Sequence, residues 1–117
     1  MATAHLVLVL AQPVLAGLFL TGNVDAIAVH SAIGSALAAV AIVLIATTLI
    51  YVVRRGSLWV LPAAVVLFFA VGLQIGMGYS RVLQIHIPLG VAIVMAALAF
   101  AVWVWTPSAA RPRGGAR

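Results

Sequence analysis

Four long apolar runs, separated by short polar breaks, constrain the fold of this chain more than any other feature. They cover about residues 4–21, 26–53, 58–79 and 82–105. A helix needs about 20 apolar residues to cross the hydrocarbon core of a bilayer. In addition, only 6% of the 117 residues are charged, whereas a soluble domain carries about 25%. The runs therefore predict an all-α integral membrane protein with four transmembrane helices.

The breaks between the runs are so short that they allow only a simple up-and-down topology. They span residues 22–25, 54–57 and 80–81, so consecutive helices must pack as antiparallel neighbours. Residues 1–105 are thus expected to form a single domain, an antiparallel four-helix bundle. The basic tail, residues 106–117, is rich in Pro, Gly and Arg, a composition that predicts disorder.

The arginines predict the orientation in the membrane. Arg54 and Arg55 lie in the second break and three more arginines in the tail, whereas only Arg81 lies on the other side. The positive-inside rule then places both termini in the cytoplasm, and we predict a multi-pass protein of the bacterial inner membrane.

Single arginines at segment ends do not form a nucleic-acid-binding stripe. The first run lacks a basic start and contains Gln12-Pro13, so we interpret it as a retained helix, with a signal peptide as the alternative.

The chain contains an internal repeat. Residues 17–34 align with residues 73–90 without a gap, and the alignment matches His30 with His86, as well as Gly22 with Gly78 and Gly34 with Gly90. Each half is expected to be a two-helix hairpin, and the halves to be related by an axis along the membrane normal. The second and fourth helices then run in the same direction. The two histidines should therefore lie at one depth, toward the outer face.

Two histidines at one depth on diagonal helices are candidate axial ligands of a b-type haem iron. Neutral imidazole nitrogens complete the coordination of such a haem, and helix bundles hold cofactors between facing side chains. His30 and His86 are each followed four residues later, on the same helix face, by a glycine that leaves room for the porphyrin, Gly34 and Gly90. Arg81 is a candidate partner for a haem propionate. Candidate acceptors for the second ring N–H of each ligand are Ser31, Ser35, Gln84 and a backbone carbonyl.

Other polar residues have plainer interpretations. A histidine near a helix end can simply be solvated or hydrogen-bonded to a neighbour, and His5, which the repeat does not match, is expected to be interfacial. The Gly72-Leu-Gln-Ile-Gly76 stretch is typical of close helix packing. Gln12 and Gln74 are amides in apolar helices and need partners; packing between helices is favoured, with contact to a cofactor or quinone as the alternative.

At these residues the chain resembles one half of haem A synthase, a family of two fused four-helix bundles. Each bundle carries a histidine on its second and fourth helices, and His30 and His86 match those positions. The stretch Gln74-Ile-Gly-Met-Gly78 is similar to that family's odd-numbered helices. The resemblance spans about residues 10–105, and the chain is also similar to small uncharacterised four-helix bacterial membrane proteins. The resemblance to haem A synthase implies a haem b site.

The chain departs from that family at one point. The catalytic half of the synthase has an acidic residue one turn before a histidine, whereas this chain has Ala26 and Ile27, and Val82 and Leu83, at those positions. The resemblance therefore implies a half that holds the cofactor, not one that oxidises haem. We predict no catalytic residue.

The leading interpretation is a small bis-histidine b-type cytochrome with its haem toward the outer face, acting in electron transfer, haem handling or redox sensing. One haem near one face cannot carry electrons across about 30 Å of bilayer, so transfer would need a redox partner or a quinone. The alternative is a cofactor-free accessory subunit of a larger membrane complex; a homo-oligomer is also open. A transporter is disfavoured because buried carboxylates are absent from the runs, and a two-histidine zinc site lacks further ligands.

Overall fold

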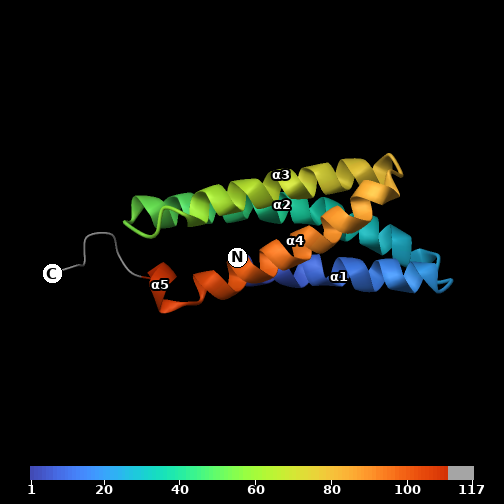
Figure 1. Ribbon diagram of the computed structural model, residues 1–117, viewed down its shortest axis with the longest axis horizontal. Coiled ribbons are helices and arrows are strands. Elements are labelled where there is room, and N and C mark those ends of the chain that lie inside the picture. The colour runs from blue at the N-terminus through green and yellow to red at the C-terminus, as the bar shows by residue number, and fades with distance from the viewer. Residues whose placement is uncertain (111–117) are drawn as a thin grey trace.

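The computed structural model describes residues 1–110, which form four long helices and one short helix (Figure 1). Their bounds are α1 Ala2–Leu20, α2 Asp25–Val53, α3 Val60–Tyr79, α4 Leu83–Val104 and α5 Pro107–Ala110. Each long helix begins and ends within two residues of the predicted run, and each is long and apolar enough to cross a membrane. The prediction of an all-α membrane bundle is confirmed.

The long helices form a closed antiparallel ring. α1 packs on α2, α2 on α3, α3 on α4, and α4 returns to α1, so that α2 and α4 face each other across the bundle (Figure 1). Short turns enforce this order, because a helix that follows a turn of a few residues can only fold back on its predecessor. Each repeated half is thus one hairpin, α1–α2 or α3–α4.

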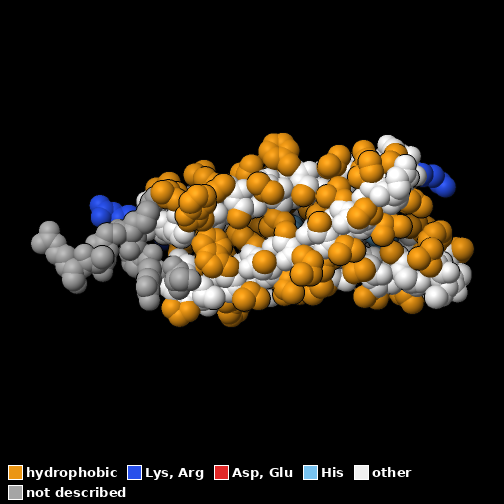
Figure 2. Space-filling model, viewed as in Figure 1, with side chains coloured by type: hydrophobic (Ala, Val, Ile, Leu, Met, Phe, Trp, Pro, Cys, Tyr) orange, Lys and Arg blue, Asp and Glu red, His pale blue; other side chains and the backbone are white. Residues whose placement is uncertain are grey.

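The bundle has an apolar interior and an apolar exterior. Buried residues from all four long helices form one core, including Val9, Leu44, Leu67 and Phe100. Hydrophobic side chains also cover the visible face between the two ends, and the basic side chains gather at those ends (Figure 2). A surface of this kind is stable only where the surroundings are themselves apolar, as in the hydrocarbon region of a bilayer.

The tail does not leave the bundle at residue 106 as predicted. The Thr106 hydroxyl donates to the Trp103 carbonyl at 2.6 Å, and Pro107 begins α5, a position that suits its fixed φ and missing N–H. Ala109 is only 2% exposed, and its carbonyl accepts a hydrogen bond from the Tyr51 hydroxyl. Disorder is therefore the wrong prediction for this first part of the tail. Residues 111–117 lie outside the described residues.

The turn between α2 and α3 depends on a glycine. The Gly56 N–H donates to the Tyr51 carbonyl at 2.9 Å, and a Cβ at Gly56 would collide with the Tyr51 ring. We expect Gly56→Ala to lower the free energy of unfolding by about 1–3 kcal/mol, the usual cost of overpacking. Circular dichroism during unfolding in detergent measures the change in the free energy of unfolding. Gly17→Ala is the control, because a Cβ there meets nothing within 4 Å; equal stability of the two variants would contradict the prediction.

Candidate functional site

The two repeated histidines meet inside the bundle. His30 on α2 and His86 on α4 have ring centroids 6.1 Å apart, with the ring planes inclined at 59°. Both side chains are half-buried. Because α2 and α4 are diagonal to each other, the rings approach across the centre of the bundle, in the half that contains the α1–α2 and α3–α4 turns.

Backbone carbonyls fix the tautomer of both rings. His30 Nδ1 lies 3.1 Å from the Gln12 carbonyl oxygen, and His86 Nδ1 lies 2.9 Å from the Gln74 carbonyl oxygen. Since a carbonyl can only accept, each Nδ1 must carry the hydrogen, and in a neutral imidazole the lone pair is then on Nε2. Histidines that bind a metal almost always donate their other N–H in this way. Of the acceptors considered from the sequence, the backbone carbonyl is the one the structure uses.

The spacing of the rings suits a single metal ion between them. A metal–nitrogen bond of about 2.0 Å and a nitrogen-to-centroid distance of about 1.1 Å place two collinear imidazole centroids about 6.2 Å apart. The observed separation is 6.1 Å. The donor set, two neutral imidazole nitrogens, is also the one that completes a b-type haem iron. The residues present therefore supply the nitrogen donors of the cofactor that the sequence predicts.

Gly90 makes room for the Gln74 side chain, and Gly34 lies beside the Gln12 side chain. A Cβ at Gly90 would lie 2.8 Å from Gln74 Nε2, and a Cβ at Gly34 would lie 3.8 Å from Gln12 Oε1. Each glutamine amide thus lies against the glycine one turn beyond the histidine of its own hairpin. The sequence suggested a different reason for these glycines, space for a porphyrin, which stays a prediction.

Each of these amides keeps one buried atom without a partner. Gln12 Nε2 and Gln74 Oε1 are buried and make no hydrogen bond to the described residues. A buried polar atom left in this state costs about 1–3 kcal/mol. The two glutamine side chains lie against Gly34 and Gly90, one helical turn beyond the histidines.

Gly78 is the third glycine of the site. It lies inside α3, where a Cβ would come within 2.9 Å of His86 Cε1. Gly22, its counterpart in the gap-free alignment, instead occupies the α1–α2 turn with φ +102°. The alignment therefore matches the histidines correctly but pairs these two glycines wrongly.

The glutamines show why the gap-free alignment fails there. Gln12 lies eight residues before the end of α1, whereas Gln74 lies five before the end of α3. His30 lies five residues after the start of α2, and His86 three after the start of α4. The first hairpin thus extends up to about one helical turn further beyond the site, and its turn projects past the α3–α4 turn in Figure 1.

The end of the bundle that contains the α1–α2 and α3–α4 turns carries the remaining polar groups of the site. Arg81 is exposed in the turn between α3 and α4, with a left-handed φ of 55°. Within residues 1–110 no ion pair joins it to Asp25, the pairing that the repeat allows. The Tyr79 hydroxyl and Ser31 Oγ lie 3.1 Å apart and connect α3 to α2. The role of Arg81 as a propionate partner stays a prediction.

His5, which is expected to be interfacial, is buried within the bundle near the start of α1. Its side chain is 1% exposed, and its Nε2 has no hydrogen-bond partner among the described residues. It precedes Gln12 by seven residues, or about 10 Å along the helix, so it does not join the paired histidines. Within the described part of the chain, no group of three or more His, Cys, Asp or Glu is placed to hold a metal ion.

No protein-family model, curated protein or solved structure matches this chain.

Proposed function

We propose that this chain is a membrane protein that binds haem b between His30 and His86, as a bis-histidine b-type cytochrome. The observation that carries the proposal is the pair of imidazoles 6.1 Å apart, each with its Nδ1 hydrogen-bonded to a glutamine carbonyl. This arrangement presents two Nε2 lone pairs and holds the rings in place before any ligand arrives.

The surrounding residues have distinct parts in this proposal. Gln12 and Gln74 orient the ligands through their carbonyls, and Gly78 lets the His86 ring pack closely on α3. Arg81, exposed at the outer turn, would pair with a propionate. Gly90 leaves space that the Gln74 amide occupies, and Gly34 lies beside the Gln12 amide.

A bound haem b supplies reversible one-electron redox chemistry, which suits electron transfer, haem handling or redox sensing. The chain itself provides ligands, an apolar enclosure and hydrogen bonds. Its only carboxylate side chain, Asp25, is exposed at the start of α2. We therefore propose a binding protein, not an enzyme that oxidises haem.

The proposed location is the bacterial inner membrane. Arg54 and Arg55 are exposed at the end of the bundle opposite the histidine site, which the positive-inside rule assigns to the cytoplasm. With both termini cytoplasmic, the site lies toward the outer face, and its electrons or haem would be exchanged there.

One observation favours a second candidate, an accessory subunit of a larger membrane complex. A Cβ at Gly72 or Gly76 would meet nothing within 4 Å, so the GxxxG stretch does not pack against another helix of this chain, contrary to the simplest expectation. Such a face lets a helix of another subunit approach closely.

An absorption spectrum tests the haem proposal directly. We expect protein purified in mild detergent, from cells supplied with a haem precursor, to show the sharp reduced α and β bands of a low-spin b-type haem after dithionite. A protein that is colourless, and stays so after reconstitution with haemin, would overturn the proposal. The polypeptides that co-purify with it would then test the accessory-subunit alternative.

A further inference from the structure

The end of the bundle opposite the histidine site carries most of the positive charge of the chain. Arg54 and Arg55 are exposed in the turn between α2 and α3, and three more of the six arginines follow α5, in residues 111–117. The only carboxylate side chain, Asp25, lies at the other end of α2. No acidic side chain therefore offsets the arginines at this end.

One tyrosine joins the two segments that carry these arginines. The Tyr51 ring packs against Gly56, the residue after Arg55, and its hydroxyl donates to the Ala109 carbonyl. Ala109 lies only two residues before Arg111 in the sequence. The α2–α3 turn and α5 are thus held at the same end of the bundle (Figure 1), although they are far apart in the chain.

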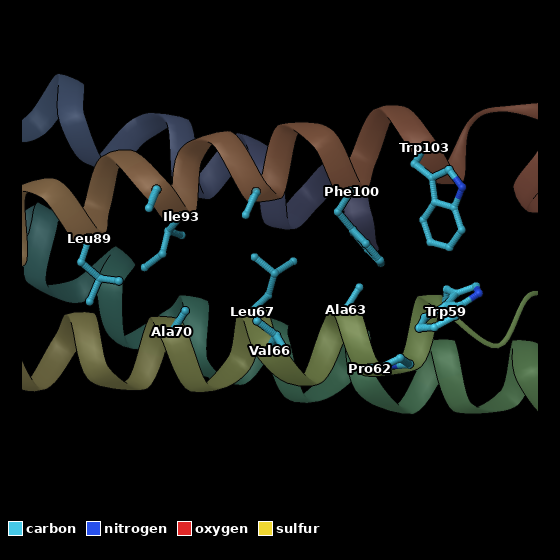
Figure 3. Close-up of a pocket in the computed structure, with 12 residues that line it drawn as sticks. Trp59, Pro62, Ala63, Val66, Leu67, Ala70, Leu89, Ile93, Phe100 and Trp103 are labelled. Atoms are coloured by element: carbon cyan, nitrogen blue, oxygen red, sulfur yellow. The ribbon is translucent and has the colours of Figure 1, made fainter.

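Apolar side chains flank the basic turn on both sides. Val53, just before the arginines, is 74% exposed, and Trp59, shortly after them, is 75% exposed. Trp59 and Trp103 lie next to each other at one end of the apolar groove between α3 and α4 (Figure 3). Tryptophan is enriched at the headgroup level of a bilayer. The arginines therefore lie at the depth at which a bilayer presents its phosphates.

We propose that this basic end binds the headgroups of anionic phospholipids such as phosphatidylglycerol. Guanidinium groups form bidentate, charge-assisted hydrogen bonds with phosphate oxygens, and basic segments next to a transmembrane helix attract anionic lipid. Because Tyr51 holds the turn and the start of the tail together, both segments contribute to binding. The lipid site is independent of the proposed haem site, which lies at the other end of the bundle.

The surroundings of the arginines favour a lipid over other anionic partners. A nucleic acid or an acidic protein would approach from water and would leave the exposed side chains of Val53 and Leu58 in contact with it. A phospholipid carries its phosphate directly above acyl chains, so it pairs with a guanidinium and covers these apolar side chains at the same time.

Quenching of tryptophan fluorescence by brominated lipid tests the proposal. All three tryptophans, Trp59, Trp103 and Trp105, lie at the basic end, so a quencher in the neighbouring lipid reports on this end. The protein is placed in phosphatidylcholine bilayers that contain either brominated phosphatidylglycerol or brominated phosphatidylcholine. The two quenching curves give a relative binding constant, which we expect to favour phosphatidylglycerol at least about fivefold, the effect of one arginine near the surface.

Two turn arginines provide a matched pair of variants. Arg55 and Arg81 are both exposed, and both have a left-handed φ, 67° and 55°, but Arg81 lies at the histidine end. Arg55→Gln should lower the relative binding constant about fivefold, whereas Arg81→Gln, which removes the same charge, should leave it unchanged. A higher ionic strength should also weaken the preference, because salt screens exposed charges.

A second pair of variants tests whether the two basic segments act together. Tyr51→Phe removes the hydrogen bond to the Ala109 carbonyl but no charge, so it should lower the relative binding constant about two- to fivefold. Tyr79→Phe removes the hydroxyl beside Ser31 at the other end and should have no effect. Circular dichroism of the variants confirms that they fold.

Three outcomes would overturn the proposal. They are equal quenching by the two brominated lipids, equal effects of Arg55→Gln and Arg81→Gln, and loss of the preference when an oligonucleotide is added, which would make a nucleic acid the better ligand. A full preference in Tyr51→Phe would overturn the contribution of the tail. The haem proposal can fail separately, because the quenching comparison is equally possible with colourless protein.

Discussion

Replacing His86 with alanine is expected to abolish the low-spin haem spectrum. The imidazole is one of the two that the proposed haem site pairs, and its ring centroid lies 6.1 Å from that of His30. Loss of residues that merely orient a metal ligand costs about 10–100-fold in affinity, so loss of the ligand itself should cost at least that much. Reduced-minus-oxidised difference spectra and haem-to-protein ratios measure the effect.

Because the site is pseudo-symmetric, His30→Ala can be compared directly with His86→Ala. His30→Ala should have an effect of the same size, because both rings have the same carbonyl support. His5→Ala removes a buried histidine outside the pair and should leave the wavelengths of the bands unchanged, even if it lowers stability. Full haem occupancy with low-spin bands in either His30→Ala or His86→Ala would assign the axial ligand elsewhere.

Adding a methyl group at Gly78 is expected to displace the His86 ring. The new Cβ would lie 2.9 Å from Cε1 and 3.2 Å from Nδ1 of that ring, closer than carbon atoms pack. The ring must move away from α3 and weaken its bond to the Gln74 carbonyl. We expect Gly78→Ala to lose most of the low-spin absorbance and to lower the free energy of unfolding by about 1–3 kcal/mol.

Gly76 provides the matched control on the same helix. A Cβ there meets nothing within 4 Å, so Gly76→Ala should keep the spectrum and stabilise the helix by up to about 1 kcal/mol, the usual advantage of alanine over glycine. Absorbance and thermal unfolding of the two variants, measured side by side, show whether haem binding needs the close contact between Gly78 and the His86 ring. If Gly78→Ala matches Gly76→Ala in both, the contact between Gly78 and the His86 ring has no importance for binding.

The fold was predictable because a bilayer leaves few choices. An apolar run of the right length must be a helix to satisfy its own backbone, and breaks as short as 80–81 force each helix back along its predecessor. The first part of the tail was not predictable in this way. Composition takes no account of a contact such as that of Tyr51 with the Ala109 carbonyl, which depends on how the end of α2 lies relative to α5.

The candidate site was predictable only in its most distinctive residues. The spacing of His30 and His86 places them at one depth, as the structure has them. The hydrogen bonds from the histidine rings to the backbone carbonyls of Gln12 and Gln74 were not predicted, because a backbone carbonyl has no signature in the sequence. Their side chains did offer a signal, since each is an amide in an apolar helix, but the unequal lengths of the two hairpins concealed their equivalence.

Each hairpin contains a complete half of the site. His30, Gln12 and Gly34 all belong to α1–α2, and His86, Gln74 and Gly90 all belong to α3–α4. The chain therefore has the organisation of a dimer whose two protomers have been joined end to end. A ligand held by both imidazoles acts as a cross-link between those protomers, and its binding free energy adds to the stability of their association.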